Sequence, residues 1–207
     1  MPHSPLKLAV LISGGGSTLA NLIERIGDGR LSGVQIKQVI SSRIDVRGND
    51  IARRANLPLC ILRPRDFASP AAFSAALTNS IDAAGVDLVV MGGFLCLYQI
   101  PAHYLGRVIN IHPALLPAYG GRGMFGHHVH EAVIAAAERE SGCTVHLADN
   151  VYDHGPIVAQ RRVPVYAHDT PQALADRVGQ AERELYPEVI ARIAREGFDW
   201  LPRISSE

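Results

Sequence analysis

An apolar run near the middle of the chain contains two polar side chains that could do chemistry. In the segment RVINIHP, Asn110 and His112 are two residues apart, and in an extended strand such residues point to the same side. An amide and a protonated imidazole both donate hydrogen bonds, and the imidazole also moves protons near neutral pH. The spacing therefore predicts a pair of donors that could stabilise negative charge at the end of a strand.

A carboxylate that could join this pair lies in the later segment NVYDHGP. Asp153 is expected in a turn between two strands, where an aspartate most often bonds only its own backbone. Beside His112 it would have another effect, because a carboxylate there would raise the pKa of the imidazole and fix its ring. The sequence leaves both interpretations of Asp153 open.

A glycine-rich turn follows the first apolar run of the chain. In SGGGSTL, residues 13–19, three glycines let the backbone approach an anion closely. The helix expected after them offers free N–H groups and a partial positive charge. A phosphate or carboxylate would suit this turn, although a simple connection between strand and helix stays open.

A dinucleotide-binding loop is the rival interpretation of the glycine-rich turn. Gly14 and Gly16 match the first two glycines of GxGxxG, but Leu19 stands where the third belongs. No acidic residue closes the next strand, where an NAD ribose would need one. Arg43 at that strand end instead suggests a second phosphate contact, with a solvated loop arginine equally open.

A short apolar loop, Leu95 to Tyr98, follows the strand expected over residues 86–93. Such a loop could pack flat against an aromatic ring system while its backbone amides bind the polar edge of the ring. The alternative is ordinary core packing, and the sequence alone does not separate the two.

These candidates fall where apolar strands and amphipathic helices alternate. Continuous apolar runs predict strands buried on both faces, and spacings of three and four predict helices. Strands are expected over residues 8–12, 34–42, 59–62, 86–93, 107–113, 142–149 and 155–166, and helices over residues 17–26, 47–56, 69–84, 129–139 and 170–196. Pro187 should end or kink the last helix.

The alternation implies an α/β fold with a doubly wound, mostly parallel twisted sheet and helices on both faces. Ligands of such sheets bind beyond the carboxyl ends of the strands, where the candidate residues lie. Because no repeat or linker interrupts the pattern, residues 1–207 are expected to form a single domain.

The composition excludes several classes of protein. Twenty basic residues balance twenty acidic ones, which argues against binding of nucleic acid through its phosphates. No apolar stretch is long enough to span a membrane. Three scattered cysteines, with no CxxC pair, indicate a reducing compartment, so a cytoplasmic protein is expected. The sequence does not decide between a monomer and a homodimer, and one of the two is expected.

The sequence resembles the phosphoribosylglycinamide formyltransferase family. The matching stretches are VLISGGGSTL, VVMGGFLCL, VINIHPALLPAYGGRGMFGHHVHEAV, SGCTVHLADNVYDHGPIVAQRRVPV and YPEVI. NIHPALLP with YDHGP is specific for domains that use 10-formyltetrahydrofolate, and the glycine-rich start points to the glycinamide ribonucleotide branch. The resemblance implies a formyltransferase fold with a Rossmann-like N-terminal half: residues up to about 100 would bind the ribonucleotide phosphate, and residues 101–207 would carry catalysis and folate binding.

The resemblance also implies the roles of individual residues. The catalytic residues would be Asn110, His112 and Asp153. The ribonucleotide would contact Ser13, Gly14, Gly15, Gly16, Ser17, Thr18 and Glu182. Arg43, suggested by its place at the strand end and not by the resemblance, would be a further contact. The folate would contact Leu95, Cys96, Leu97, Tyr98, Asn110, Ala148, Asp149 and Asp153. The chain departs from its relatives at Gly15, Thr18, Cys96 and Gly179. These departures affect the expected contacts with the substrates more than the expected chemistry.

The implied activity is transfer of the formyl group of 10-formyltetrahydrofolate to the amine of glycinamide ribonucleotide, without a metal. A 10-formyltetrahydrofolate hydrolase is the alternative, because it would share the same trio. A methionyl-tRNA formyltransferase would be longer and more basic. Two further classes stay open: a metal site at His127, His128 and His130, and a nucleotide-binding module without catalysis.

Overall fold

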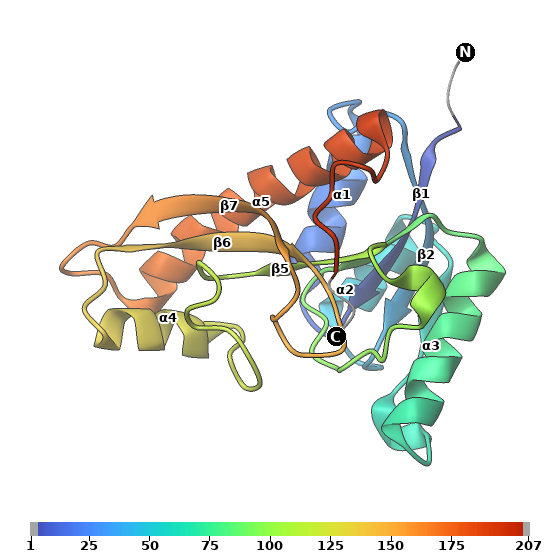
Figure 1. Ribbon diagram of the computed structural model, residues 1–207, viewed down its shortest axis with the longest axis horizontal. Coiled ribbons are helices and arrows are strands. Elements are labelled where there is room, and N and C mark those ends of the chain that lie inside the picture. The colour runs from blue at the N-terminus through green and yellow to red at the C-terminus, as the bar shows by residue number, and fades with distance from the viewer. Residues whose placement is uncertain (1–3, 205–207) are drawn as a thin grey trace.

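One twisted sheet of seven strands runs through the computed structural model, which describes residues 4–204 (Figure 1). The strands lie in the order β3-β2-β1-β4-β5-β6-β7. Their bounds are Leu6–Ile12 for β1, Val34–Ser41 for β2, Leu59–Ile61 for β3, Leu88–Met91 for β4, Val108–His112 for β5, Glu140–Leu147 for β6 and Ile157–Pro164 for β7. The first five strands are parallel, and β6 and β7 are antiparallel to their neighbours.

Five α-helices connect or cover these strands. They are α1, Ser17–Gly27; α2, Arg47–Arg54; α3, Pro70–Ala84; α4, His127–Ala135; and α5, Pro171–Glu196. Short 3-10 turns occur at Pro64–Asp66 and Ala102–Tyr104. Within residues 4–204, no helix combines the length and the apolar character needed to cross a bilayer.

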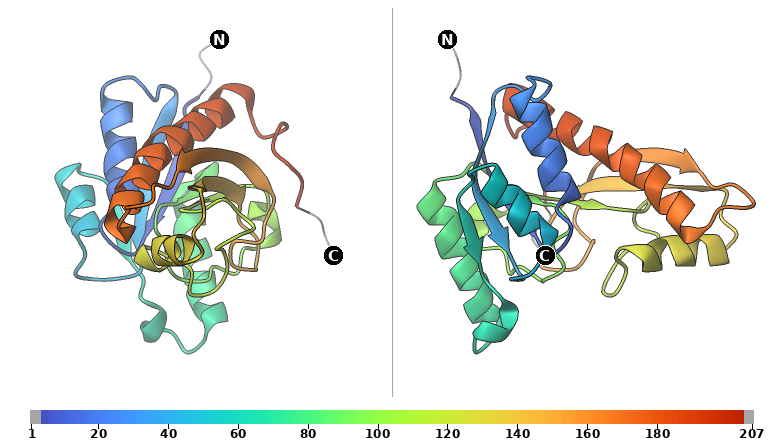
Figure 2. Two further views of the ribbon diagram at one scale, coloured as in Figure 1. Left: turned by 90° about the vertical axis from the view of Figure 1, so that its left-hand side faces the viewer. Right: turned by 180° about the vertical axis from the view of Figure 1, so that it is seen from behind.

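The strands are buried on both faces, as their apolar runs predict. On β1, Leu8 and Val10 pack into the core beneath α1, α2 and α5, whereas Ala9 and Leu11 pack against α3. Figures 1 and 2 show α1 and α5 side by side on one face, with α3 on the other. The expected doubly wound α/β sheet with helices on both faces is therefore confirmed.

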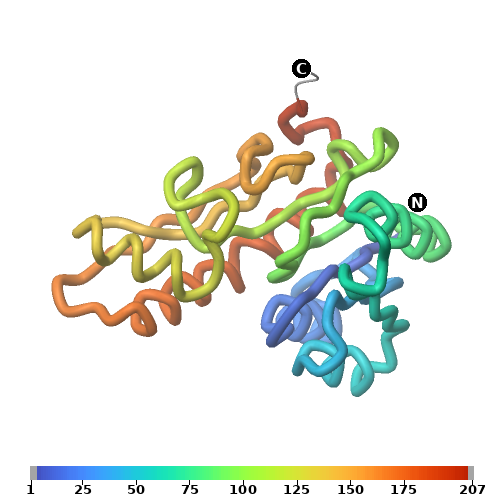
Figure 3. Tube along the Cα trace, turned by 90° about the horizontal axis from the view of Figure 1, so that it is seen from below, coloured from blue at the N-terminus to red at the C-terminus, as the bar shows by residue number. Residues whose placement is uncertain are grey.

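The second half of the chain extends the molecule away from this core. Figure 3 shows the first two strands and helices gathered at one end, while β6, β7, α4 and the start of α5 reach toward the other. Helix α4 covers His127–Ala135, not the expected residues 129–139. It follows Gly126, which has a positive φ of 57°, and it ends before Ala137, which is left-handed with φ 53°.

Pro187 was expected to end or kink the last helix. It does not end the helix, because α5 continues through Pro187 to Glu196. A proline cannot donate to the carbonyl four residues earlier, that of Arg183. The side chain of Asn21, on α1, donates to this carbonyl at 2.9 Å. Because the freed carbonyl has a new partner on the neighbouring helix, the cost of the proline is reduced.

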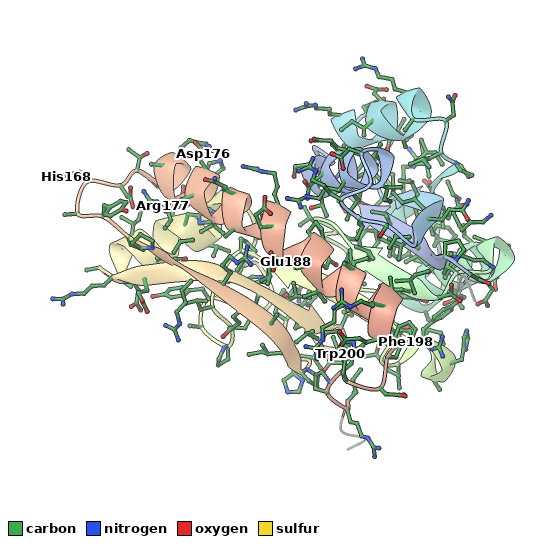
Figure 4. The ribbon with its side chains drawn as sticks, turned by 90° about the horizontal axis from the view of Figure 1, so that it is seen from above. His168, Asp176, Arg177, Glu188, Phe198 and Trp200 are labelled. Atoms are coloured by element: carbon green, nitrogen blue, oxygen red, sulfur yellow. The ribbon has the colours of Figure 1, made fainter. Side chains whose placement is uncertain are left out.

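An arginine contact lies at each end of α5. Figure 4 labels Arg177 and Trp200, which take part in these two contacts. Near the start, Arg177 pairs with Asp169 at 2.6 Å. Beyond the end, the guanidinium of Arg192 lies 3.9 Å from the centre of the Trp200 ring. Between these two ends, α5 packs across β6 and β7.

The chain changes direction across the sheet between β1 and β4. From β1 the order runs outward through β2 to β3, and then returns to β4 on the other side of β1. The loops after β1 and β4 therefore separate and leave a crevice at the carboxyl edge of the sheet. Ser13 joins the rims of this crevice, because its hydroxyl meets that of Ser42 at 2.6 Å and accepts the Leu95 amide at 2.9 Å.

Candidate active site

The end of β5 holds Asn110 and His112 next to the turn that carries Asp153. Asn110 Nδ2 lies 3.4 Å from Asp153 Oδ1, and His112 Nδ1 lies 3.4 Å from Asp153 Oδ2. The other ring nitrogen of His112, Nε2, donates to the carbonyl of Tyr119 at 2.7 Å. The structure thus brings together three side chains from two segments that are distant in the sequence.

Asp153 is held by the shape of its turn between β6 and β7. Its own backbone is left-handed, with φ 53°. The Gly121 amide donates to its Oδ2 at 3.0 Å. A Cβ at Gly155 would collide with the Leu147 carbonyl, and one at Gly120 would lie 3.3 Å from the Asp153 Cβ. Glycines at these positions therefore let the turn pack closely enough to present the carboxylate.

His146 joins this group, although sequence reasoning did not single it out. It lies on β6 directly opposite Asn110 in the antiparallel pair. Its Nε2 accepts from Asn110 Nδ2 at 3.0 Å, and its Nδ1 donates to the Leu147 carbonyl at 2.9 Å. This tautomer, assigned from the hydrogen bonds, orients the Asn110 amide. The sequence offers only one indication of this role, which is that a polar histidine lies near the end of an apolar strand.

Burial and neighbouring groups together set the pKa values of His112 and Asp153. Burial lowers the pKa of His112 below that of a free imidazole, and the charge of Asp153 and the Tyr119 carbonyl offset only part of this effect. Asp153 thus raises the pKa of His112, as expected, but burial outweighs this contribution and the net shift is downward. Burial alone would raise the pKa of Asp153, but its contacts with His146, His112 and Gly121 together lower it below the usual range.

A cavity of about 510 Å³ opens beside the trio. Its walls include the turn Gly14–Thr18, the loop Gly121–Gly126, Glu182, Asn110 and His112. Gly16 is left-handed at the start of α1, and a Cβ there would lie 2.6 Å from Gly48 Cα. At Gly14 and Gly15 a Cβ would meet nothing within 4 Å, so their backbone faces open space.

A narrower cavity of about 60 Å³ lies on the other side of the trio. It collects most of the side chains that the family resemblance assigns to folate. They are Cys96, Leu97, Tyr98, Asn110, Ala148, Asp149 and Asp153. Asn110 and Asp153 line both cavities, so the trio stands where the two cavities meet.

Three residues that were expected to contact a substrate do not line the cavity proposed for that substrate. Leu95 lines the larger cavity and not the narrower one. Ser13 is fully buried beneath the glycine turn and lines neither. Arg43 is exposed and also lies outside both linings. Arg43 thus lies outside the cavity that gathers Gly14–Thr18 and Glu182.

The clustered histidines fall in the first turns of α4. His128 is exposed and lies 3.3 Å from Glu131, whereas His130 is buried in the wall of the larger cavity. In the described part of the chain, no group of three or more histidine, cysteine or acidic side chains is arranged to hold a metal ion.

The loop from β5 to α4 is anchored to β6. The hydroxyl of Thr144 donates to the Ala114 carbonyl at 2.7 Å and accepts the Leu116 amide at 3.0 Å. The Leu116–Pro117 peptide bond, whose state the sequence left open, is cis. This anchoring places the Tyr119 carbonyl against His112 and the Gly121 amide against Asp153.

Together, a doubly wound sheet and an Asn-His-Asp trio between two cavities define a group-transfer type of α/β enzyme. The model of the formyl transferase family matches residues 6–190, and the chain belongs to this family. The family resemblance expected from the sequence is therefore confirmed.

The chain is similar to named phosphoribosylglycinamide formyltransferases. It is 38% identical to the chloroplastic enzyme of Arabidopsis thaliana over 207 residues, which cover 96% of this chain and 69% of the relative. It is 34% identical to that of Escherichia coli, covering 91% and 87%. A glycinamide ribonucleotide transformylase structure from Symbiobacterium toebii superposes with a TM-score of 0.86 at 34% identity, covering 99% and 96%.

Proposed function

We propose that this protein transfers the formyl group of 10-formyltetrahydrofolate to the amine of glycinamide ribonucleotide, a step of purine biosynthesis. One observation carries the proposal: Asn110, His112 and Asp153 meet at the boundary between two cavities that differ in size and in lining residues. Relatives that carry this activity in their names match nearly the whole chain. A transferase needs the donor and the acceptor to meet at one catalytic group, and this arrangement provides such a place.

The two cavities divide the substrates in this proposal. The ribonucleotide occupies the larger one, with its phosphate at Gly14–Thr18 and the N-terminus of α1. Glu182, whose pKa burial raises to about 7, is placed to accept hydroxyl groups of the sugar. The folate ring occupies the narrower cavity, against Cys96, Leu97 and the turn after β6.

The chemistry follows from the trio. The acceptor nitrogen attacks the formyl carbon, forming a C–N bond and a tetrahedral oxyanion. Asn110 donates to this oxygen through its amide, and His112 donates through Nδ1 once the forming negative charge has led the ring to take up a proton. Their 3.4 Å contacts with Asp153 are the ones a substrate oxygen would displace. Asp153 accepts the proton of the attacking amine and passes it toward N10, as the bond from the formyl carbon to N10 breaks.

Hydrolysis of 10-formyltetrahydrofolate is the second candidate, because water could replace the amine at the same trio. The glycine turn and the size of the larger cavity favour a phosphorylated acceptor. An assay of folate deformylation with and without glycinamide ribonucleotide separates the two reactions. Deformylation that requires the ribonucleotide supports transfer, whereas the same rate without it supports hydrolysis.

The setting of this activity is also part of the proposal. A reducing cytoplasm fits the three cysteines, all of which are free thiols. Small-molecule substrates are the only partners the mechanism requires, and the protein acts as a monomer or a homodimer. Sedimentation of the purified protein distinguishes these two states.

A further inference from the structure

The larger cavity is poor in positive charge for a site that would hold a phosphate. Within residues 4–204, Arg122 is the only lysine or arginine in its lining. Two carboxylates, Asp153 and Glu182, line the same cavity, and the nearby imidazole of His112 has a lowered pKa. A phosphate dianion facing those carboxylates needs a compensating cation close by.

Arg122 is placed to provide that charge. It lies on the loop between β5 and α4, which stands out beside α4 in Figure 1. Gly121 and Gly123 flank it with φ values of 94° and 92°, which only glycine adopts freely. Arg122 is exposed, and no other side chain of residues 4–204 forms a hydrogen bond or an ion pair with its guanidinium. An arginine in this state can turn its fork of donors to a phosphate.

Another part of the cavity lining, at the start of α1, offers donors of a different kind. The turn Gly14–Thr18 presents backbone amides and the N-terminus of α1, and the space above Gly14 and Gly15 is open. These groups are neutral or only partly charged. Arg43, the cation that the sequence suggested for this purpose, lies outside the cavity lining.

We propose, resting on the function proposed above, that Arg122 binds the phosphomonoester of the acceptor. Its guanidinium adds a full positive charge to the phosphate site that the amides of the Gly14–Thr18 turn begin in the same cavity. The carboxylates of the folate glutamate tail are the competing ligand. Arg122 lines the larger cavity and not the narrower one that gathers the folate residues, which favours the phosphate.

The test compares Arg122→Ala, Arg122→Lys and the control Arg65→Ala, which removes an exposed arginine outside the cavity. Loss of a charged hydrogen bond should raise the KM for glycinamide ribonucleotide roughly tenfold in Arg122→Ala, with kcat little changed. Arg122→Lys should recover part of the loss, and Arg65→Ala should match the wild type. The KM for the folate donor should stay the same in all three.

An acceptor without its phosphate, glycinamide riboside, makes the test specific. Wild type and Arg122→Ala should use the riboside equally well, because the contact that the substitution removes is absent. An equal loss on both acceptors, or a rise in the KM for folate instead, would overturn the assignment. Calorimetric titration with glycinamide ribonucleotide alone measures the same contact without turnover, so a wild type that binds the ribonucleotide but transfers no formyl group contradicts the proposed function only.

Discussion

Oδ2 of Asp153 lies 3.4 Å from Nδ1 of His112, although one residue comes from the turn after β6 and the other from the end of β5. The second nitrogen of His112 meets the Tyr119 carbonyl, so both ring nitrogens face an acceptor. Burial nevertheless lowers the pKa of His112. The ring is therefore neutral near neutral pH. Its protonated form becomes more favourable when negative charge forms beside it.

Replacing Asp153 with Asn should reduce turnover by roughly a hundredfold or more, since an amide cannot accept the proton of the attacking amine. Binding of the folate should be largely kept, because the substitution changes little of the cavity wall. Steady-state kinetics and calorimetric titration with folate measure the two effects. Asp176→Asn, on the exposed face of α5, is the matched control. Near-normal turnover in Asp153→Asn would remove this residue from the mechanism.

Replacing His146 with Ala should lower kcat roughly tenfold while the KM for both substrates stays within about twofold. The imidazole accepts from Asn110 at 3.0 Å, so its loss frees the amide to rotate away from the oxyanion. His168→Ala, an exposed histidine before α5, serves as the control. If kcat is unchanged while the variant remains folded by circular dichroism, His146 does not orient Asn110.

Glu182 should make the protein less stable as the pH rises from about 4.5 to about 7. Burial raises its pKa to about 7 in the folded state, while the unfolded chain loses this proton near pH 4.3. The folded state holds more protons in this window, so the free energy of unfolding falls with pH, by an amount on the order of 2 kcal/mol.

Glu182→Gln should remove that decline. Urea unfolding of the variant and the wild type at several pH values measures the difference. The variant should gain stability relative to the wild type between pH 4.5 and pH 7, with a constant difference above pH 8. Parallel curves for the two proteins across this range would contradict the raised pKa.

Gly155→Ala should destabilise the protein by about 2 kcal/mol or more, because the new methyl group would collide with the Leu147 carbonyl. Turnover should fall as well, since the same turn presents Asp153. Gly27→Ala, at the end of α1, is the matched control, because a Cβ there meets nothing within 4 Å. It should leave the free energy of unfolding within about 1 kcal/mol of wild type. Equal stability of the two variants would mean that the turn can relax.

The strands, the helices and the Asn110–His112 pair could be predicted because each depends on a local rule. Period-2 spacing placed Asn110 and His112 on one side of β5, whereas Asp153 was assigned to the trio only through the family resemblance. His146 escaped prediction because its position opposite Asn110 depends on the pairing of β5 with β6, which no local pattern specifies.

Two other features depend on contacts between distant segments. The helix α5 passes through Pro187 because Asn21, on another helix, satisfies the freed carbonyl of Arg183. Arg122 enters the wall of the larger cavity because Thr144 anchors the loop that leads to it. The sequence gives no signal that Asn21 bonds this carbonyl or that Arg122 lines the cavity, because both positions depend on segments that meet only in the folded chain.

The fate of the formyl carbon tests the central claim most directly. Purified protein is supplied with 10-formyltetrahydrofolate labelled in its formyl carbon, together with glycinamide ribonucleotide, and the products are separated by mass spectrometry. Formyl transfer predicts the label on the amine nitrogen of the ribonucleotide, in amounts equal to the tetrahydrofolate released. Label recovered as free formate, with the ribonucleotide unchanged, would contradict the account.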